Sequence, residues 1–302
     1  MKHSTPLVFF GSDDFSLPSL QALRRDGYDV ALVVSKAPPA QKSGRRAASA
    51  PLFKWAKDQG LPLATPEHLD EDFLRQVQKT GAEYAVLASY GKILPVSVLD
   101  SFKAIINVHP SLLPRWRGPS PIEAAILAGD QTTGVSLMQL SKDMDAGPVY
   151  GQTEVNLTGQ EDQASLTRTL AELGAVFLSE QLPLILSGQL SAREQDSAAA
   201  SYCRLIKKSD GVIDWQKPAL DIERQVRAYR LWPKASAKLY KVDVTITKAH
   251  VTERRGEPGE VFQTKSAVGV MTSNGALIIE RLKPAGKNEM SSAEFLRGYV
   301  RG

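Results

Sequence analysis

Short apolar runs alternate with amphipathic stretches along the first 190 or so residues of the chain. The runs short enough to be buried strands lie at Leu7–Phe10, Val30–Val34, Ala85–Ala88, Ala104–Val108, Gly134–Leu140 and Val149–Val155. The stretches with helical spacing of apolar residues are Phe15–Asp26, Pro51–Gln59, Leu69–Thr80 and Ser165–Leu186. Alternation of this kind is typical of parallel βαβ units. The front of the chain is therefore predicted to be α/β, with a doubly wound, mostly parallel Rossmann-like sheet.

The pattern changes after Ser187–Ser201, a segment rich in Ser, Ala, Gly and Gln that lacks a clear period. Beyond it, Leu220–Arg230 has helical spacing. Short strand-like runs separated by turn residues follow at Ala237–Lys241, Val244–Ile246, Glu260–Phe262, Val268–Met271 and Ala276–Ile279. Strands so short and so regularly spaced indicate a small β-barrel.

Near the end of the chain, Ser291–Glu294 has the spacing of a capping box, which predicts a closing helix through Val300. We therefore predict three parts: an α/β domain over residues 1–188, a linker over 189–205 and a smaller OB-like β-barrel domain over 206–302.

Composition restricts the class of protein. The single cysteine, Cys203, has neither a second cysteine for an internal disulfide nor a cluster of histidines for a shared metal. The N-terminal apolar run Leu7–Phe10 has four residues, whereas a secretory signal needs about 7–15. No segment approaches the roughly 18 apolar residues of a membrane span. We expect a soluble, cytoplasmic and monomeric protein without a metal or a membrane partner.

Charge is unevenly distributed, although the net charge is only +4. From Arg204 to Gly302 there are 19 Lys and Arg against 11 Asp and Glu, whereas the rest of the chain holds 18 against 22. A basic C-terminal part joined to a neutral or acidic N-terminal part is expected when one part carries out chemistry and another binds a polyanion. A solvated basic surface without a partner is the alternative that composition leaves open.

The strongest candidates for catalytic side chains lie at the end of the predicted strand Ala104–Val108. In sheets of this kind, ligands bind at the carboxyl ends of the strands. Asn107 and His109 stand two residues apart, so a strand would place both on one side. An amide and an imidazole there could point at one oxygen, as acyl transfer requires for the charge that develops on the carbonyl oxygen. A structural histidine in a turn is the alternative.

A second loop, Ser141–Pro148, holds Asp145 between two predicted strands. A carboxylate that reached His109 could orient the imidazole and favour its protonated form as a donor to the oxyanion. An ordinary turn of Asp, Gly and Pro is the alternative for this loop.

Together these segments resemble the folate-dependent formyltransferase family. The matching motifs are Asn107-x-His109-Pro110-Ser111-Leu112-Leu113-Pro114, Gly134-Val135-Ser136 and Asp145-x-Gly147-Pro148. The family's catalytic set of Asn, His and Asp implies that Asn107, His109 and Asp145 are catalytic. Its folate contact implies a site for the donor, 10-formyltetrahydrofolate, at Ser111, Leu112, Leu113 and Pro114.

Within the family the chain is similar to the branch that formylates methionyl-initiator tRNA. The similar stretches are Phe9–Phe15, where Asp13-Asp14 replaces the more usual Thr-Pro-Asp, Pro114–Ile122, where Pro119-Ser120 stands where two alanines are common, and Ile213–Trp215. This resemblance implies that the formyl group goes to the α-amino group of methionine on initiator tRNA. It also implies that the basic C-terminal barrel binds the tRNA.

The branch has a basic loop after its second strand, which corresponds here to Gln41–Ala47. The resemblance implies that Lys42, Arg45 and Arg46 contact tRNA phosphates. A solvated charged loop is the alternative.

Two other functions stay open at this point. One is a related enzyme that formylates a small amine, either glycinamide ribonucleotide or an amino-sugar nucleotide. Enzymes of the first kind are about one domain shorter, and those of the second usually lack so basic a tail. The other is a non-catalytic protein that binds RNA or folate, against which the intact set of Asn107, His109 and Asp145 argues. Binding of NAD is not expected, because Gly11 stands alone without a G-x-G-x-x-G fingerprint.

Overall fold

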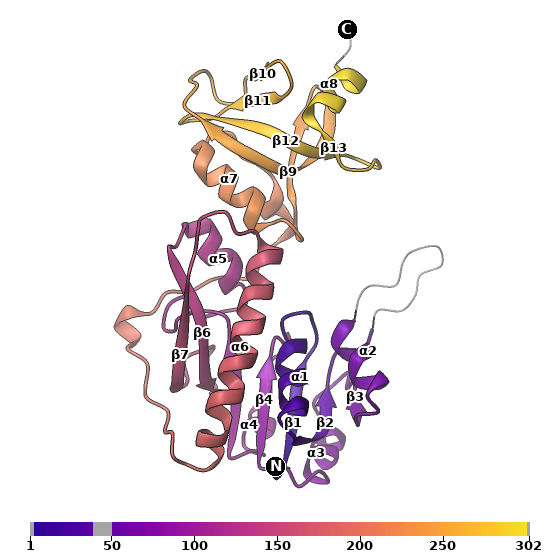
Figure 1. Ribbon diagram of the computed structural model, residues 1–302, viewed down its shortest axis with the longest axis vertical. Coiled ribbons are helices and arrows are strands. Elements are labelled where there is room, and N and C mark those ends of the chain that lie inside the picture. The colour runs from indigo at the N-terminus through magenta and orange to yellow at the C-terminus, as the bar shows by residue number, and fades with distance from the viewer. Residues whose placement is uncertain (1–2, 39–49, 301–302) are drawn as a thin grey trace. The chain divides into compact units, whose positions relative to one another are not determined.

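The computed structural model describes residues 3–38 and 50–300, and the chain divides into two compact units (Figure 1). The first unit holds Met1–Pro121, Thr132–Asn156 and Thr167–Cys203. The second holds Ile122–Gln131, Leu157–Leu166 and Arg204–Gly302. Each unit gathers separate segments of the chain, so no single position divides them. The domain bounds derived from the sequence remain a prediction.

A seven-stranded sheet forms the centre of the first unit, with its strands in the order β3-β2-β1-β4-β5-β6-β7. The strands are β1 (His3–Gly11), β2 (Tyr28–Val34), β3 (Leu63–Ala64), β4 (Tyr84–Ala88), β5 (Ala104–His109), β6 (Thr132–Gln139) and β7 (Val149–Asn156). Strands β1 to β5 are parallel, whereas β6 and β7 run antiparallel to their neighbours. The prediction of a mostly parallel, Rossmann-like sheet is confirmed.

Among the described residues, six α-helices lie between or after these strands. They are α1 (Leu17–Arg25), α2 (Pro51–Asp58), α3 (Glu71–Gln78), α4 (Val96–Leu99), α5 (Pro121–Ala128) and α6 (Gln163–Leu186). The hydrophobic pattern did not predict α4, α5 or the short strand β3. Helix α5 is apolar nearly all round, so no polar face recurs at helical spacing. Strand β3 has two residues, too few to show a period.

The packing around β1 and β5 fixes the part of the sheet that bears the site. Phe10 of β1 meets Phe73, Tyr90 and Phe102 edge-on, with ring centroids 5.5–6.3 Å apart. Helix α6 runs along the sheet (Figure 1) and approaches β5 at Gly174, where an added Cβ would come within 2.8 Å of the Val108 side chain. Only a glycine allows this approach, and the close packing holds β5 in place.

Helix α6 is the one helix among the described residues that is long and apolar enough to cross a membrane. The prediction that no segment approaches a membrane span is therefore wrong for this helix, because its average hydropathy is high although polar residues interrupt it. Leu166, Leu170, Leu178 and Leu182 are fully buried and recur at multiples of four residues, as on a core-facing helix. A buried core helix can have the same length and composition, so this finding is only weak evidence for a membrane span.

The second unit is built on a curled antiparallel sheet with the strand order β10-β11-β12-β9-β8, in which β13 also pairs with β12. Its strands are β8 (Ala235–Leu239), β9 (Val242–Thr252), β10 (Val261–Gln263), β11 (Val268–Met271), β12 (Ala276–Pro284) and β13 (Met290–Ser291). Its helices are α7 (Ala219–Ala228) and α8 (Ser292–Tyr299), together with α5 beyond Pro121 and the first residues of α6. Short 3₁₀ turns occur at Ser197–Ala199 in the first unit and Lys208–Gly211 in the second.

One apolar core joins the curled sheet to its helices, with Ile222 and Val226 from α7 and Phe295 from α8 packed against the strands. The capping box is present, since Ser291 Oγ accepts a hydrogen bond from Glu294 N and the Glu294 carboxylate accepts one from Ser291 N. The predictions of an OB-like fold and of a closing helix are confirmed.

Candidate active site

Asn107 and His109 lie at the end of β5 and are 6% and 4% exposed. Residues two apart on a strand share a face, so both side chains lie on one side of the sheet. Across the ladder, Asn107 pairs with Met138 and His109 with Ser136, both of β6. The side-chain amide of Asn107 makes no hydrogen bond to any residue within 3–38 or 50–300. Its donors are therefore available to a ligand.

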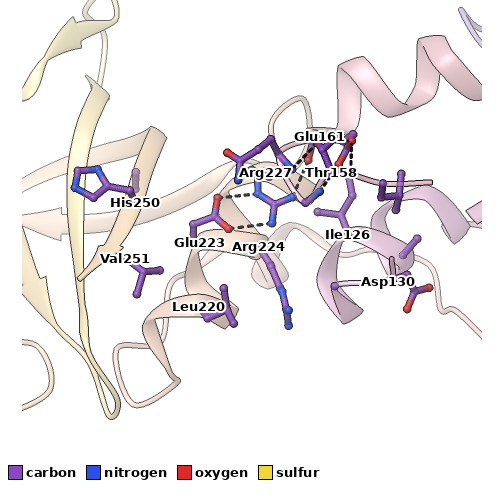
Figure 2. A pocket seen from close by; sticks show the side chains of 16 residues that line it. Ile126, Asp130, Thr158, Glu161, Leu220, Glu223, Arg224, Arg227, His250 and Val251 are labelled. Atoms are coloured by element: carbon purple, nitrogen blue, oxygen red, sulfur yellow. Dashed lines mark hydrogen bonds and ion pairs between the residues drawn. The ribbon is translucent and has the colours of Figure 1, made fainter. Parts of the chain in front are cut away.

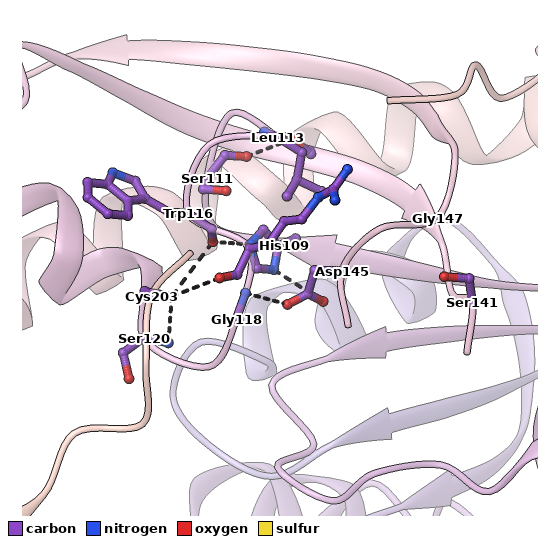
Figure 3. Close-up of polar contacts among 12 residues, drawn as sticks. His109, Ser111, Leu113, Trp116, Gly118, Ser120, Ser141, Asp145, Gly147 and Cys203 are labelled. Carbon is purple, nitrogen blue, oxygen red and sulfur yellow. Dashed lines mark hydrogen bonds and ion pairs between the residues drawn. The ribbon is translucent and has the colours of Figure 1, made fainter. Parts of the chain in front are cut away.

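The ring of His109 lies between two oxygen atoms (Figure 3). Its Nε2 is 3.1 Å from the carbonyl oxygen of Trp116, and its Nδ1 is 3.8 Å from Asp145 Oδ1. The second distance is that of an ion pair and longer than a hydrogen bond. Trp116 has a φ of 59°, which is rare for a bulky residue and here aims its carbonyl at the ring. The ring therefore has an oxygen neighbour on each side, one within hydrogen-bond distance and one beyond it.

Asp145 comes from the connection between the antiparallel strands β6 and β7. Its Oδ2 accepts a hydrogen bond of 2.8 Å from Gly118 N, which lies in the loop after β5. Gly118 has a φ of 121°, and an added Cβ would lie 2.2 Å from the carbonyl oxygen of Cys203. Only a glycine fits there. The carboxylate thus joins two loops that are 27 residues apart and faces the ring of His109.

The stretch Ser111–Pro114, where the resemblance implies the donor, is held by hydrogen bonds from β6 and β7. Ser136 Oγ donates to Ser111 O at 2.6 Å and accepts from Leu113 N at 3.0 Å. Gln152 Nε2 donates to Leu113 O at 2.7 Å. Ser111 and Leu113 are buried, whereas the other two residues of the stretch are half-buried and present apolar surface. Contact with the donor remains a prediction.

A groove of about 720 Å³ opens beside this stretch, lined by Leu113, Pro114, the start of β7 and part of the segment 189–196. Small-molecule sites occupy about 300–1,000 Å³, so the groove lies within their range of sizes.

The end of the segment predicted as a linker packs directly on the loop after β5. Ser201 N donates to Pro114 O at 3.1 Å, Arg117 N to Ser201 O at 2.9 Å, and Cys203 N to Arg117 O at 2.8 Å. Ser120 N donates to Cys203 Sγ at 3.3 Å. Most of these bonds use backbone atoms, which any residue supplies, so the composition of the segment carried no signal of this role.

A further carboxylate that the sequence left without a role lies after β1. Asp13 accepts hydrogen bonds from Phe15 N, from Ser16 N and from Ser89 Oγ in the loop after β4. Burial raises the pKa of Asp13, and these hydrogen bonds act in the opposite direction. Strands β1 and β4 are neighbours, so Asp13 ties together the loops that follow them.

The predicted tRNA contacts, Lys42, Arg45 and Arg46, lie outside the described residues. Within the part of the chain that the structure does describe, no three His, Cys, Asp or Glu side chains gather as a metal-ligand set.

The second unit has a cavity of its own, of about 390 Å³, lined in part by α7, β9 and the residues 157–161 (Figure 2). Arg227 donates to both carboxylate oxygens of Glu223, at 2.7 and 2.9 Å, and to Glu161 O at 2.8 Å. This guanidinium therefore holds α7 to the 157–161 loop. None of the predicted site residues lines this cavity.

Comparison with protein families gives two matches. Residues 6–182 match the family described as formyl transferase, and residues 205–300 match the family described as formyl transferase, C-terminal domain.

Individual relatives extend along the whole chain. The methionyl-tRNA formyltransferase of Roseiflexus castenholzii is 38% identical over 98% of this chain and 96% of its own. That of Methylococcus capsulatus is 36% identical over 97% of each chain. Among solved structures, HypX from Aquifex aeolicus in complex with tetrahydrofolic acid has a TM-score of 0.65 at 19% identity. This match covers 98% of the chain and 47% of HypX, so the chain spans about half the length of that protein.

Proposed function

Since the chain belongs to the formyl transferase family, as its motifs predicted, we propose that it transfers the formyl group of 10-formyltetrahydrofolate to the α-amino group of methionyl-initiator tRNA. The acceptor is supported by full-length relatives at 36–38% identity that are named methionyl-tRNA formyltransferases. The donor class agrees with the tetrahydrofolate complex of HypX, whose fold this chain shares.

The observation that carries the proposal is that Asn107 and His109 share one face at the end of β5, and that Asp145, from the connection between β6 and β7, faces the ring of His109. The side-chain amide of Asn107 has no hydrogen-bond partner among the described residues, and His109 Nδ1 is 3.8 Å from the Asp145 carboxylate. Fixed donors beside a carboxylate form an arrangement that suits a reaction in which a carbonyl oxygen gains negative charge.

In the reaction, the methionyl α-amine attacks the formyl carbon of a donor that lies along Ser111–Pro114. Asn107 and protonated His109 donate hydrogen bonds to the oxyanion that forms. For this, the ring of His109 exchanges one of its two present oxygen neighbours for the formyl oxygen. Asp145 holds the imidazole and accepts the amine proton, directly or through water. The bond from the formyl carbon to N10 of the folate then breaks, N10 gains a proton, and tetrahydrofolate leaves.

The distribution of charge along the chain suggests that catalysis and tRNA binding belong to different parts of it. We assign chemistry to residues 1–188 and tRNA binding to residues 206–302, which carry the basic excess, together with Lys42, Arg45 and Arg46. Phosphate contacts of this kind fix the position of the acceptor end rather than its sequence. We further propose that the enzyme acts in the cytoplasm as a monomer.

The direct test is transfer of labelled formyl from 10-formyltetrahydrofolate to methionyl-initiator tRNA. Methionyl-elongator tRNA, glycinamide ribonucleotide and an amino-sugar nucleotide serve as competing acceptors. We expect product with the initiator and little with the other three. Preferred formylation of a small amine would move the assignment to a sibling enzyme, and no transfer to any acceptor would overturn it.

A second measurement addresses tRNA binding alone. Uncharged initiator tRNA should protect residues 237–301 from proteolysis, because the basic strands of the second unit would then be covered. Cleavage at the same rate with and without tRNA would contradict this assignment.

A further inference from the structure

A half-buried side chain from the segment predicted as a linker, that of Gln195, binds the backbone of the turn that bears the candidate catalytic carboxylate. Gln195 Nε2 donates to Asp145 O at 2.9 Å and to Gly147 O at 2.7 Å. Gln195 Oε1 accepts from Arg117 Nε at 3.0 Å. The two ends of this amide cannot be exchanged, because a guanidinium only donates and carbonyl oxygens only accept. One amide therefore bridges a donor on one side and two acceptors on the other.

The donor side of this bridge is itself fixed. Arg117 is 3% exposed, its Nη1 donates to the hydroxyl of Tyr202 at 3.3 Å, and its guanidinium lies 5.9 Å from the centre of that ring. Its Nη2 is buried without a hydrogen-bond partner among the described residues. A buried guanidinium held in this way has few alternative positions, so it orients Gln195 firmly.

The acceptor side is a turn that needs support. Asp145 has a φ of 48°, a left-handed conformation that costs free energy for any residue with a side chain. Gly147 presses against the end of β6, where an added Cβ would lie 2.0 Å from Gln139 O. Gln195 binds the carbonyls on both sides of Ala146 and so fixes the turn from which the Asp145 carboxylate reaches Gly118 N and His109.

We propose that Gln195 is a positioning residue for formyl transfer, which holds the Asp145 carboxylate at its present distance from the ring of His109. The inference rests on the proposed function and adds to it a residue that acts through Asp145. It assigns a role to the segment 189–205, which the sequence predicted as a linker and which lies in the first unit up to Cys203.

The substitution Gln195→Glu tests this most sharply. Glutamate keeps an oxygen for Arg117 Nε but places a second oxygen against the two carbonyl oxygens, so only the bonds to the turn are lost. A displacement of about 1 Å in such a site can lower the rate about 100-fold. We expect kcat to fall roughly 10- to 100-fold, and the KM values for both substrates to stay within about twofold.

Gln76→Glu is the matched control, because the substitution adds the same charge at an exposed residue of α3 in the same unit.

A spectroscopic measurement separates a positioning role from a general loss of stability. The Nδ1 resonance of His109, one of 4 histidines, should move in Gln195→Glu and stay unchanged in Gln76→Glu. If Gln195→Glu does not fold, Gln195→Met, which removes both ends of the bridge without adding charge, carries the same expectations.

The outcomes distinguish this inference from the proposed function. If the wild-type enzyme transfers formyl to methionyl-initiator tRNA and the folded variant has the same kcat and the same His109 resonance, the positioning role is wrong. A fall in kcat without any change at His109 would also overturn it, because the effect would not pass through Asp145. An inactive wild-type enzyme would instead refute the proposed function.

Discussion

The two units use charge in opposite ways. In the first, the polar groups of the candidate site are few, buried and bonded across loops, as in the contacts of Asp145 with Gly118 and His109. In the second, ion pairs such as Lys248 with Glu280 lie on an accessible surface. Stabilising a developing oxyanion requires donors that do not reorganise, whereas binding a polyanion requires only accessible charge. The contrast predicts that chemistry and tRNA affinity can be changed separately.

The largest effect should follow removal of an oxyanion donor. Asn107→Ala and His109→Ala are each expected to lower kcat by about 100- to 1,000-fold or more, because a lost donor of this kind cannot be replaced by water at the same position. Affinity for tRNA, measured by filter binding, should stay within about twofold. The control is Asn156→Ala, at the end of β7. Normal formylation by either site variant would refute the assignment.

The next effect concerns the charge beside the imidazole. Asp145→Asn can still accept from Gly118 N through its side-chain oxygen, but the negative charge 3.8 Å from His109 Nδ1 is lost. We expect kcat to fall about 100-fold, as for loss of a general acid–base partner. Asp143→Asn, two residues earlier and exposed, should stay near wild type in the same steady-state assay. Equal losses in both variants would mean that only the loop's overall charge matters.

Salt should weaken tRNA binding, which we assign to the second unit, and leave the chemistry of the first unit unchanged. Raising the salt concentration from about 50 to about 200 mM weakens several phosphate contacts at once, so the KM for methionyl-initiator tRNA should rise about tenfold or more. The value of kcat should change less than about twofold, because the site residues are buried. A loss of kcat at constant KM would contradict the separation of the two functions.

The smallest effect is on stability alone. The Arg204 guanidinium and the backbone N–H of Lys207 lower the pKa of Asp210 from its ordinary 3.8 to about 2. A folded-state pKa below the unfolded one stabilises the protein above the unfolded pKa, and this contribution is lost as the pH falls through about 2. Because Arg204 is exposed, Asp210→Asn should lower the free energy of unfolding near neutral pH by only about 0.5–1 kcal/mol.

Chemical denaturation at several pH values measures this effect. The difference between wild type and Asp210→Asn should shrink as the pH falls from about 4 through about 2, and kcat at neutral pH should be unchanged. A difference of the same size at both ends of the pH range would contradict the ionic origin of the effect.

Much of the fold was predictable, because buried strands and amphipathic helices leave a period in the sequence. The strand that ends in Asn107 and His109 was predicted in this way, and the motif around Asp145 came from the resemblance. Gly118 and Trp116 were not predicted as part of the site, since their roles depend on backbone conformations with positive φ. Gln195 was hidden for another reason: its bonds join residues 48–78 positions apart within a segment of unremarkable composition.

The central claim is that Asn107 and His109 donate to the formyl oxygen of the bound donor, with Asp145 facing the ring of His109. It is tested most directly by a crystal structure with a donor analogue in which carbon replaces N10, so that the formyl group cannot leave. We predict the formyl oxygen within about 3 Å of Asn107 Nδ2 and of a ring nitrogen of His109, the distance of a hydrogen bond. A formyl oxygen bound farther than about 6 Å from both donors, beyond any hydrogen bond, would contradict the account.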